Sequence, residues 1–123
     1  MNKKRLYGIR GAVHTLNKAD ALQKAVTDLM TRLFTENSLN EDDIVSVQFT
    51  LTQDLDCLNP AQAVRQAGMC TSAPLFCAQE PHIKGARTGI IRVLVSAYLE
   101  NKPVHVYTGG AESLRPDFAG ALN

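Results

Sequence analysis

The sequence predicts a small α/β (α+β) fold, in which one long and one short helix cover a mixed sheet of about five strands. Three patterns indicate it: apolar residues recur at helical spacing over residues 18–36, apolar and polar residues alternate over 44–52, and β-branched residues fill 89–99. The chain has 123 residues, of which 45% are hydrophobic and 20% charged. This length and composition predict a single globular domain spanning residues 1–123.

The first half of the chain predicts a strand, a helix and a second strand. Residues 5–13 (RLYGIRGAV) are the first strand, with glycines that permit close backbone approach. The helix at about 18–36 takes Asn17 as its N-cap and ends in ENSLN, and we assign its apolar stripe to core packing. After a helical turn at NEDD, the second strand buries alternate residues, namely Val45, Val47, Phe49 and Leu51.

The second half predicts a short helix and three more strands. Asn59 caps the short helix, Pro60 opens it and Gly68 ends it. The strands are a brief buried one at 73–79, a long one at 89–99 and a last one at 103–108. The remainder predicts an irregular tail, mobile over about residues 112–123. Because both helices cover one face of the sheet, the uncovered face predicts self-association.

The charge and the cysteine spacing argue against nucleic-acid-binding, membrane, disulfide-rich and metal-binding proteins. The formal net charge is +1 with both signs interspersed, which gives no argument for a nucleic acid or membrane partner. No stretch reaches the ~18 apolar residues of a spanning helix. Cys57, Cys70 and Cys77 form no C-x-x-C motif, and the three histidines are scattered. We therefore expect a reduced, cytoplasmic protein without a metal site or cofactor.

A charged residue inside an apolar run is the strongest local signal. Arg92 interrupts IIRVLV, and a buried charge is costly unless an anion pairs with it. Cys77 and Glu80 stand near the end of the preceding strand, where Pro81 favours an extended exit into a loop. That loop returns the chain so that Glu80 and Arg92 can face one pocket. The alternative is a structural ion pair, with Cys77 as a small buried hydrophobic residue.

Further arginines favour a site for carboxylates. Arg10 lies between Gly8 and Gly11 in the first strand, Arg65 lies in the short helix and Arg115 in the LRPD of the tail. Together with Arg92 and Tyr107 they would offer planar, bidentate donors that suit carboxylates. The chain shows no Ser-His-Asp order, phosphate-binding glycine loop or paired carboxylates. The predicted chemistry is anion recognition without a nucleophile.

Seven short motifs occur in the order and spacing of AroH-class chorismate mutases: YGIRGA, QFTLTQDL, NPAQAVRQAGM, PLFCAQE, GIIRVL, HVY and LRPD. The chain resembles this family from residue 7 to about 118, including the spacing of twelve between Glu80 and Arg92. The resemblance implies conversion of chorismate to prephenate in the shikimate pathway to phenylalanine and tyrosine. It also implies a homotrimer of pseudo-α/β-barrel form with active sites between subunits, and no cofactor.

The resemblance assigns roles to individual residues. Arg92 would donate to the ether oxygen of chorismate, while Glu80 and Cys77 would hold the ring hydroxyl, with Glu80 near positive charge developing on the ring. Six further residues would bind the substrate: Arg10 and Tyr107 at the side-chain carboxylate, Arg65 and Arg115 at the cleft mouth, and Phe76 and Ala61 as walls.

The chain also departs from the family pattern, and two other functions stay open on the sequence. Asn59 and Gln62 replace an expected apolar and an expected basic residue, and TGGAES places Gly109 and Gly110 before the LRPD motif. One alternative is an imine deaminase of the trimeric RidA-like class. The other is a trimeric module, or a divergent mutase, that binds an aromatic-pathway carboxylate without turnover.

Overall fold

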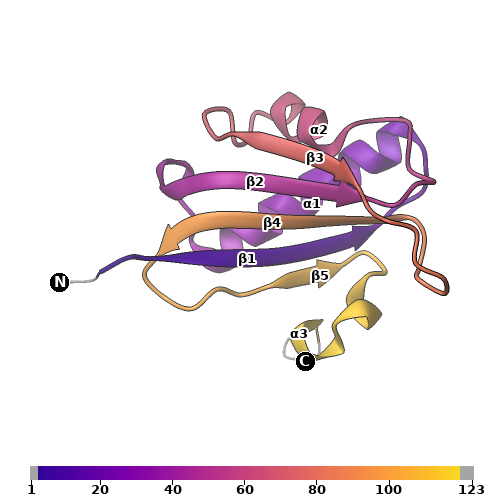
Figure 1. Cartoon of the computed structure of the whole chain (residues 1–123). Coiled ribbons are helices and arrows are strands. Elements are labelled where there is room, and N and C mark those ends of the chain that lie inside the picture. The colour runs from indigo at the N-terminus through magenta and orange to yellow at the C-terminus, as the bar shows by residue number, and fades with distance from the viewer. Residues whose placement is uncertain (1–2, 120–123) are drawn as a thin grey trace.

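Five strands form one mixed sheet in the computed structural model, which describes residues 3–119 (Figure 1). Across the sheet their order is β3-β2-β4-β1-β5. Their bounds are β1 (Arg5–His14), β2 (Ile44–Leu51), β3 (Leu75–Gln79), β4 (Ile90–Leu99) and β5 (Val106–Thr108). The central strand β4 is antiparallel to β1 and β2, while β3 and β5 pair in parallel with β2 and β1. The predicted five-stranded mixed sheet is confirmed.

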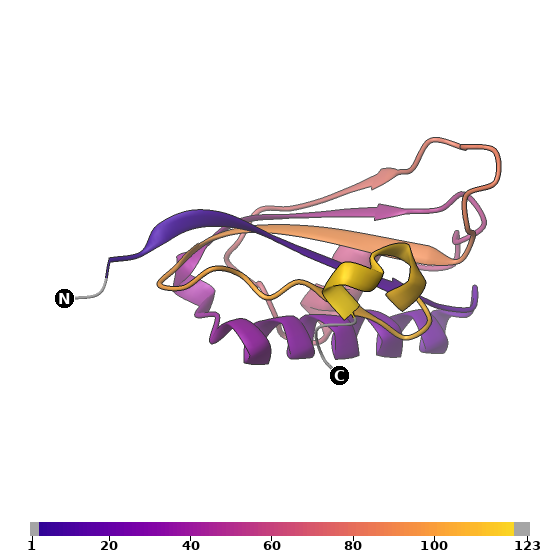
Figure 2. The same cartoon turned by 90° about the horizontal axis from the view of Figure 1, so that it is seen from below.

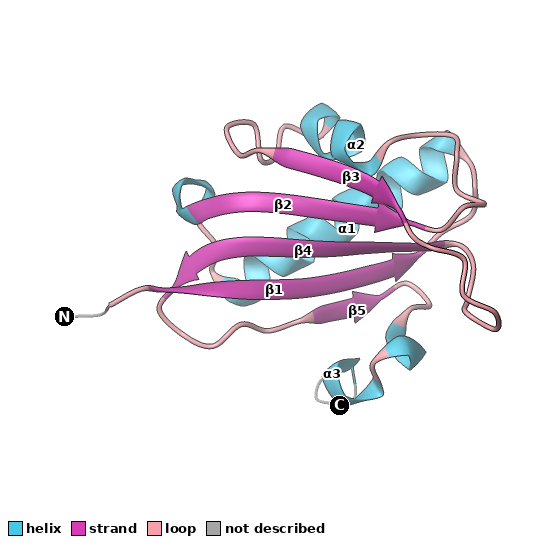
Figure 3. Cartoon of the chain, in the orientation of Figure 1, coloured by secondary structure: helices cyan, strands magenta, loops and turns pink. Residues whose placement is uncertain are grey.

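The two main helices lie on one face of this sheet, and the opposite face carries no helix in the described part of the chain (Figure 2). They are α1 (Ala19–Asn37) and α2 (Pro60–Gln66), shown in cyan in Figure 3. Three shorter turns complete the secondary structure: η1 (Glu41–Asp43), η2 (Glu112–Leu114) and α3 (Pro116–Ala119). The last two occupy the segment predicted to be irregular, and residues 120–123 of that predicted tail lie outside the described residues.

Strand alternation divides the side chains between the two faces. Odd-numbered residues of β1 and β4 point to α1, whose own stripe of Leu22, Val26, Leu29, Met30 and Leu33 is buried. Each such residue contributes roughly 1.5–3 kcal/mol by leaving water. Gly11 allows the close approach of helix and strand, because a Cβ there would lie 3.0 Å from Val93 Cγ1 and 3.3 Å from Leu29 Cδ1.

Three local predictions were wrong. Asn17 does not cap α1; its side-chain oxygen accepts the backbone N–H groups of Asp56 and Cys57, which ties two connections together. Val45 is exposed, because a register shift between β2 and β4 at this point takes it off the buried face. The strand at 73–79 was predicted to be buried, but β3 lies at the edge of the sheet and its side chains are only partly buried.

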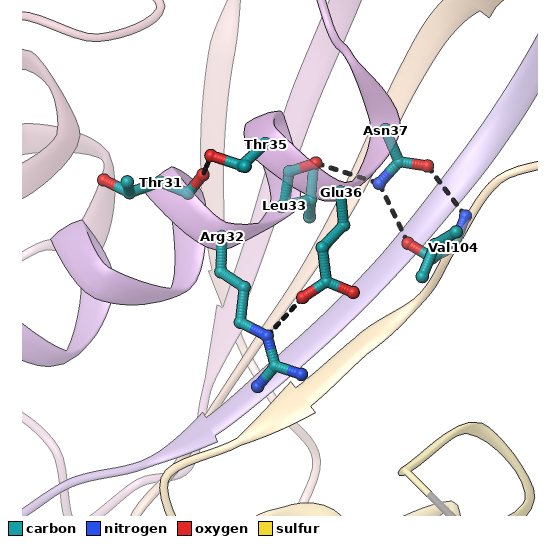
Figure 4. Close-up of polar contacts among 7 residues, drawn as sticks. All are labelled: Thr31, Arg32, Leu33, Thr35, Glu36, Asn37 and Val104. Carbon is teal, nitrogen blue, oxygen red and sulfur yellow. Dashed lines mark hydrogen bonds and ion pairs between the residues drawn. The ribbon is translucent and has the colours of Figure 1, made fainter. Parts of the chain in front are cut away.

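Asn37 joins the end of α1 to the segment that leads into β5 (Figure 4). Its amide nitrogen donates to Leu33 O and Val104 O, each at 2.9 Å, and its oxygen accepts the Val104 N–H at 2.7 Å. The side chain thus pairs with both backbone groups of Val104, as a neighbouring strand would. This contact positions the start of β5 against the rest of the domain.

We expect Asn37→Ala to lower the free energy of unfolding by about 1–2 kcal/mol, because two inter-segment hydrogen bonds are lost. Thr35→Ala is the matched control, since the Thr35 hydroxyl bonds, within the described residues, only to Thr31 O of its own helix. Urea denaturation followed by circular dichroism measures both. Equal effects of the two substitutions would contradict the role assigned to Asn37.

Candidate active site

The face of the sheet without helices carries several of the polar residues that the sequence singled out. Arg10 on β1 and Arg92 on β4 are diagonal neighbours, because Arg92 pairs with Ala12 and Arg10 with Leu94. Thr50 stands directly opposite Arg92, and Tyr107 is in register with Ala12. These four side chains line a cavity of about 320 Å³.

Arg92 and Glu80 lie close together and form an ion pair, which the sequence left open as the alternative to two residues facing one pocket. Arg92 Nε lies 3.2 and 3.1 Å from the two carboxylate oxygens of Glu80, and the Thr50 hydroxyl donates to Glu80 Oε2 at 2.8 Å. Glu80 follows the last residue of β3, where its N–H donates to Leu51 O. Two polar partners and a fixed backbone therefore determine the position of this carboxylate.

The Arg92–Glu80 ion pair is accessible to solvent, unlike an ion pair that is fully buried and serves only to stabilise the fold. The Arg92 side chain is 41% exposed and that of Glu80 is 19% exposed. Within residues 3–119 the guanidinium bonds to Glu80 only through Nε, so its two terminal amino groups remain available to an anion. Arg92 also lines a second cavity of about 600 Å³, together with Glu80 and the loop that follows it.

The cationic end of the site extends from Arg10 to Arg115. Within the described residues the Arg10 guanidinium is in no salt bridge, while its backbone N–H donates to His105 Nδ1 at 2.9 Å. Burial lowers the pKa of His105, the charges of Arg10 and Arg115 lower it further, and Asp117 opposes them. Arg115 bonds to Asp117 at 3.1 and 2.7 Å. Sequence reasoning missed His105, since HVY alone gave no signal for a backbone contact.

The remaining predicted residues lie in other places. Cys77 is in register with Phe49, so its thiol packs on the core side, and burial raises the pKa of that thiol. Phe76 faces the open side at the sheet edge and is 70% exposed. Ala61 is buried in α2, and Arg65 is exposed on the same helix. One chain therefore brings Arg10, Glu80, Arg92 and Tyr107 together (with Arg115 close by) but not Ala61, Arg65 or the Cys77 thiol.

This arrangement favours electrostatic chemistry on an organic anion. Two arginines, a tyrosine and a fixed carboxylate surround the open face, and none of them forms a nucleophile–base pair in the described structure. Residues 3–119 contain no group of three or more His, Cys, Asp or Glu side chains suited to a metal ion. Across the same residues, no helix has the length and apolarity needed to cross a membrane.

Comparisons with known proteins agree with one another. Residues 6–118 match the family described as "Chorismate mutase type I". The chain is 34% identical over 119 residues to "Chorismate mutase AroH" of Thermus thermophilus, covering 93% of this chain and 97% of the relative. The Bacillus subtilis (strain 168) protein of that name is 32% identical over 121 residues, with 94% of each chain covered. A solved chorismate mutase from Clostridium thermocellum superposes with a TM-score of 0.82 at 36% identity, covering 87% of this chain and 98% of that one.

The His105–Arg10 contact predicts a pH dependence of stability. Because folding lowers the pKa of His105, the unfolded chain binds more protons below the ordinary value of 6.5, so the free energy of unfolding falls as the pH drops through that region. His105→Asn keeps an acceptor for the Arg10 N–H without titrating, and we expect a flatter profile. Urea denaturation between about pH 8 and pH 5 measures this. Identical profiles for both proteins would refute the role of His105.

Proposed function

We propose that Arg92 and Glu80 form the catalytic centre of this enzyme, because the chain belongs to the type I, AroH-type chorismate mutases. It is an isomerase of aromatic amino-acid biosynthesis that converts chorismate to prephenate. The reaction is an intramolecular rearrangement, so it needs no nucleophile and no proton transfer. The site must hold a compact conformer and stabilise separating charge. The single observation that carries the assignment of residues is the accessible, fixed Arg92–Glu80 pair beside Arg10 and Tyr107.

Arg92 is the proposed donor to the ether oxygen, where negative charge grows as the bond breaks. Glu80 accepts from Nε, so the terminal amino groups of Arg92 can donate to a ligand. An acceleration of ~10⁶-fold requires about 8 kcal/mol. One fixed donor at a developing oxyanion supplies roughly 3 kcal/mol, so conformer selection and other charges supply the rest.

The other residues of the same face would bind and orient the substrate. Glu80, fixed by Thr50, accepts the ring hydroxyl and lies near the positive charge that develops on the ring. Arg10 and Tyr107 bind the side-chain carboxylate, and Arg115 attracts the dianion at the cleft mouth. This division follows the geometry, since Arg10 on β1 and Tyr107 on β5 line the cavity on the same side of Arg92 in β4.

Cys77 would act through its backbone. The contacts of Pro74 O and Glu80 N with β2 place the even-numbered backbone groups of β3 toward β2. Alternation then directs the N–H of Cys77 to the open edge of the sheet. We assign the ring-hydroxyl contact of Cys77 to this amide, because the thiol faces the core.

A homotrimer with sites between subunits would explain two further features. Leu6, Phe76, Leu94 and Tyr98 expose apolar surface, and strand alternation places them on the face that lacks helices. Ala61 and Arg65 belong to the opposite side of the chain, so they reach a substrate on the open face only from a neighbouring subunit. The family match disfavours both the RidA-like and the non-catalytic alternative. We further propose that the enzyme acts in the cytoplasm.

Arg92→Lys should lose most of the activity, by at least about 100-fold, because an ammonium group cannot reproduce the planar fork that Glu80 holds. A proton NMR time course of chorismate, with and without protein, measures prephenate directly. Arg92→Ala should behave the same way, while Arg32→Ala on α1 keeps the wild-type rate. Near-normal turnover of the lysine variant would remove the proposed role.

The assembly is tested at the Leu6–Tyr98 pair on the open face. We expect the wild-type protein to have three times the chain mass in light scattering, and Leu6→Glu to dissociate it and lower kcat/KM. Leu16→Glu is the control, because Leu16 is as exposed (61% against 56%) but lies beyond the end of β1. A monomeric wild type, or a trimeric Leu6→Glu variant, would contradict the proposed interface.

A further inference from the structure

Arg87 links two loops that lie on either side of the active site. Its Nη1 donates to Gly110 O at 2.7 Å and to the Ser113 hydroxyl at 2.9 Å. Arg87 belongs to the loop of residues 80–89, which connects β3 to β4 and begins at Glu80. Its acceptors belong to residues 109–115, the segment that follows β5, which we call the C-terminal turn.

The C-terminal turn starts at two glycines and is closed by short-range hydrogen bonds. It begins with Gly109 and Gly110, whose φ angles are 60° and 100°, so the unfolded chain is unusually free at this point. The turn is closed locally by the Glu112 carboxylate, which accepts the Gly110 N–H at 2.8 Å, and by the Ala111 and Leu114 N–H groups. Arg87, from a distant part of the sequence, adds two side-chain hydrogen bonds to this turn.

The position of this turn matters for the substrate. Tyr107 precedes it and Arg115 ends it, while Ala111 and Leu114 pack against the cluster of Ala12, Ile90 and Tyr107. The loop of residues 80–89 in turn connects Glu80 to the strand of Arg92 (Figure 1). A bond between loop and turn therefore joins the Glu80–Arg92 side of the site to the Tyr107–Arg115 side.

We propose that Arg87 is a positioning residue that holds the C-terminal turn in place, so that Tyr107 and Arg115 meet the substrate carboxylates in register with Arg92. This inference rests on the proposed function of those three residues. Arg87 acts through its hydrogen bonds to Gly110 and Ser113. A direct action of its charge on the dianion is the competing explanation, because Arg87 also lines the cavity of about 600 Å³ with Glu80 and Arg92.

The experiment combines Arg87→Ala, Ser113→Ala, the double variant and the control Lys84→Ala, which removes an exposed charge from the same loop. Hydrogen exchange without substrate should become faster over residues 108–115 in Arg87→Ala and stay unchanged in Lys84→Ala. We expect KM for chorismate to rise about fivefold to tenfold in Arg87→Ala, with a much smaller change in kcat. Ser113→Ala should raise KM less than Arg87→Ala does. The KM of the double variant should not exceed that of Arg87→Ala, because both substitutions remove the same Arg87–Ser113 hydrogen bond.

Three outcomes would overturn the proposal. Unchanged exchange in Arg87→Ala would show that the contact does not hold the turn. A rise in KM that depends on ionic strength, without any effect of Ser113→Ala, would assign the action to charge. Faster exchange with an unchanged KM would show that the turn does not position a substrate group. The activity of Arg92→Ala is measured beside these variants, so a failure of the proposed function is recognised separately.

Discussion

A cation on the central strand of the sheet is the constraint on which the rest of the structure depends. Arg92 lies in β4 between residues that bury their side chains against α1, so strand alternation turns its guanidinium to the opposite face. A helix packed there would bury the charge at a cost of several kcal/mol. The face therefore stays without helices in the described part of the chain, Glu80 pairs with the charge and is itself bonded by Thr50, and apolar side chains nearby are exposed.

The sheet also supplies the precision that electrostatic catalysis requires. The spacing of Arg10, Thr50 and Arg92 is set by ladder registers, and these registers are maintained by the buried faces of the same strands. Donors fixed in this way need no reorganisation when charge develops on a ligand. The energy of core packing thus determines the geometry of the site, and residues far from the substrate contribute to it.

The order of elements and the proximity of Glu80 to Arg92 could be predicted because both follow from local patterns, namely periodicity, proline and loop length. The errors have other causes. The displacement of Val45 arises from a register shift between two strands, and the exposure of β3 follows from its place at the edge of the sheet. Asn17, His105 and Arg87 bond to backbone or side-chain groups far along the chain. Contacts of this kind leave no periodic signal in the sequence.

The two glycines after β5 illustrate how tertiary contacts replace local order. Their positive φ angles suit a tight turn and remove the rigidity that side chains would give. Long-range polar contacts then fix the segment on both sides: Asn37 pairs with Val104 before β5, and Arg87 bonds to Gly110 and Ser113 after it. The position of Tyr107 depends on both contacts as well as on its own ladder with β1. Long-range side-chain hydrogen bonds therefore supplement the backbone ladder on the Tyr107 side of the candidate site, whereas Arg10 and Arg92 are positioned by the ladder registers of their strands.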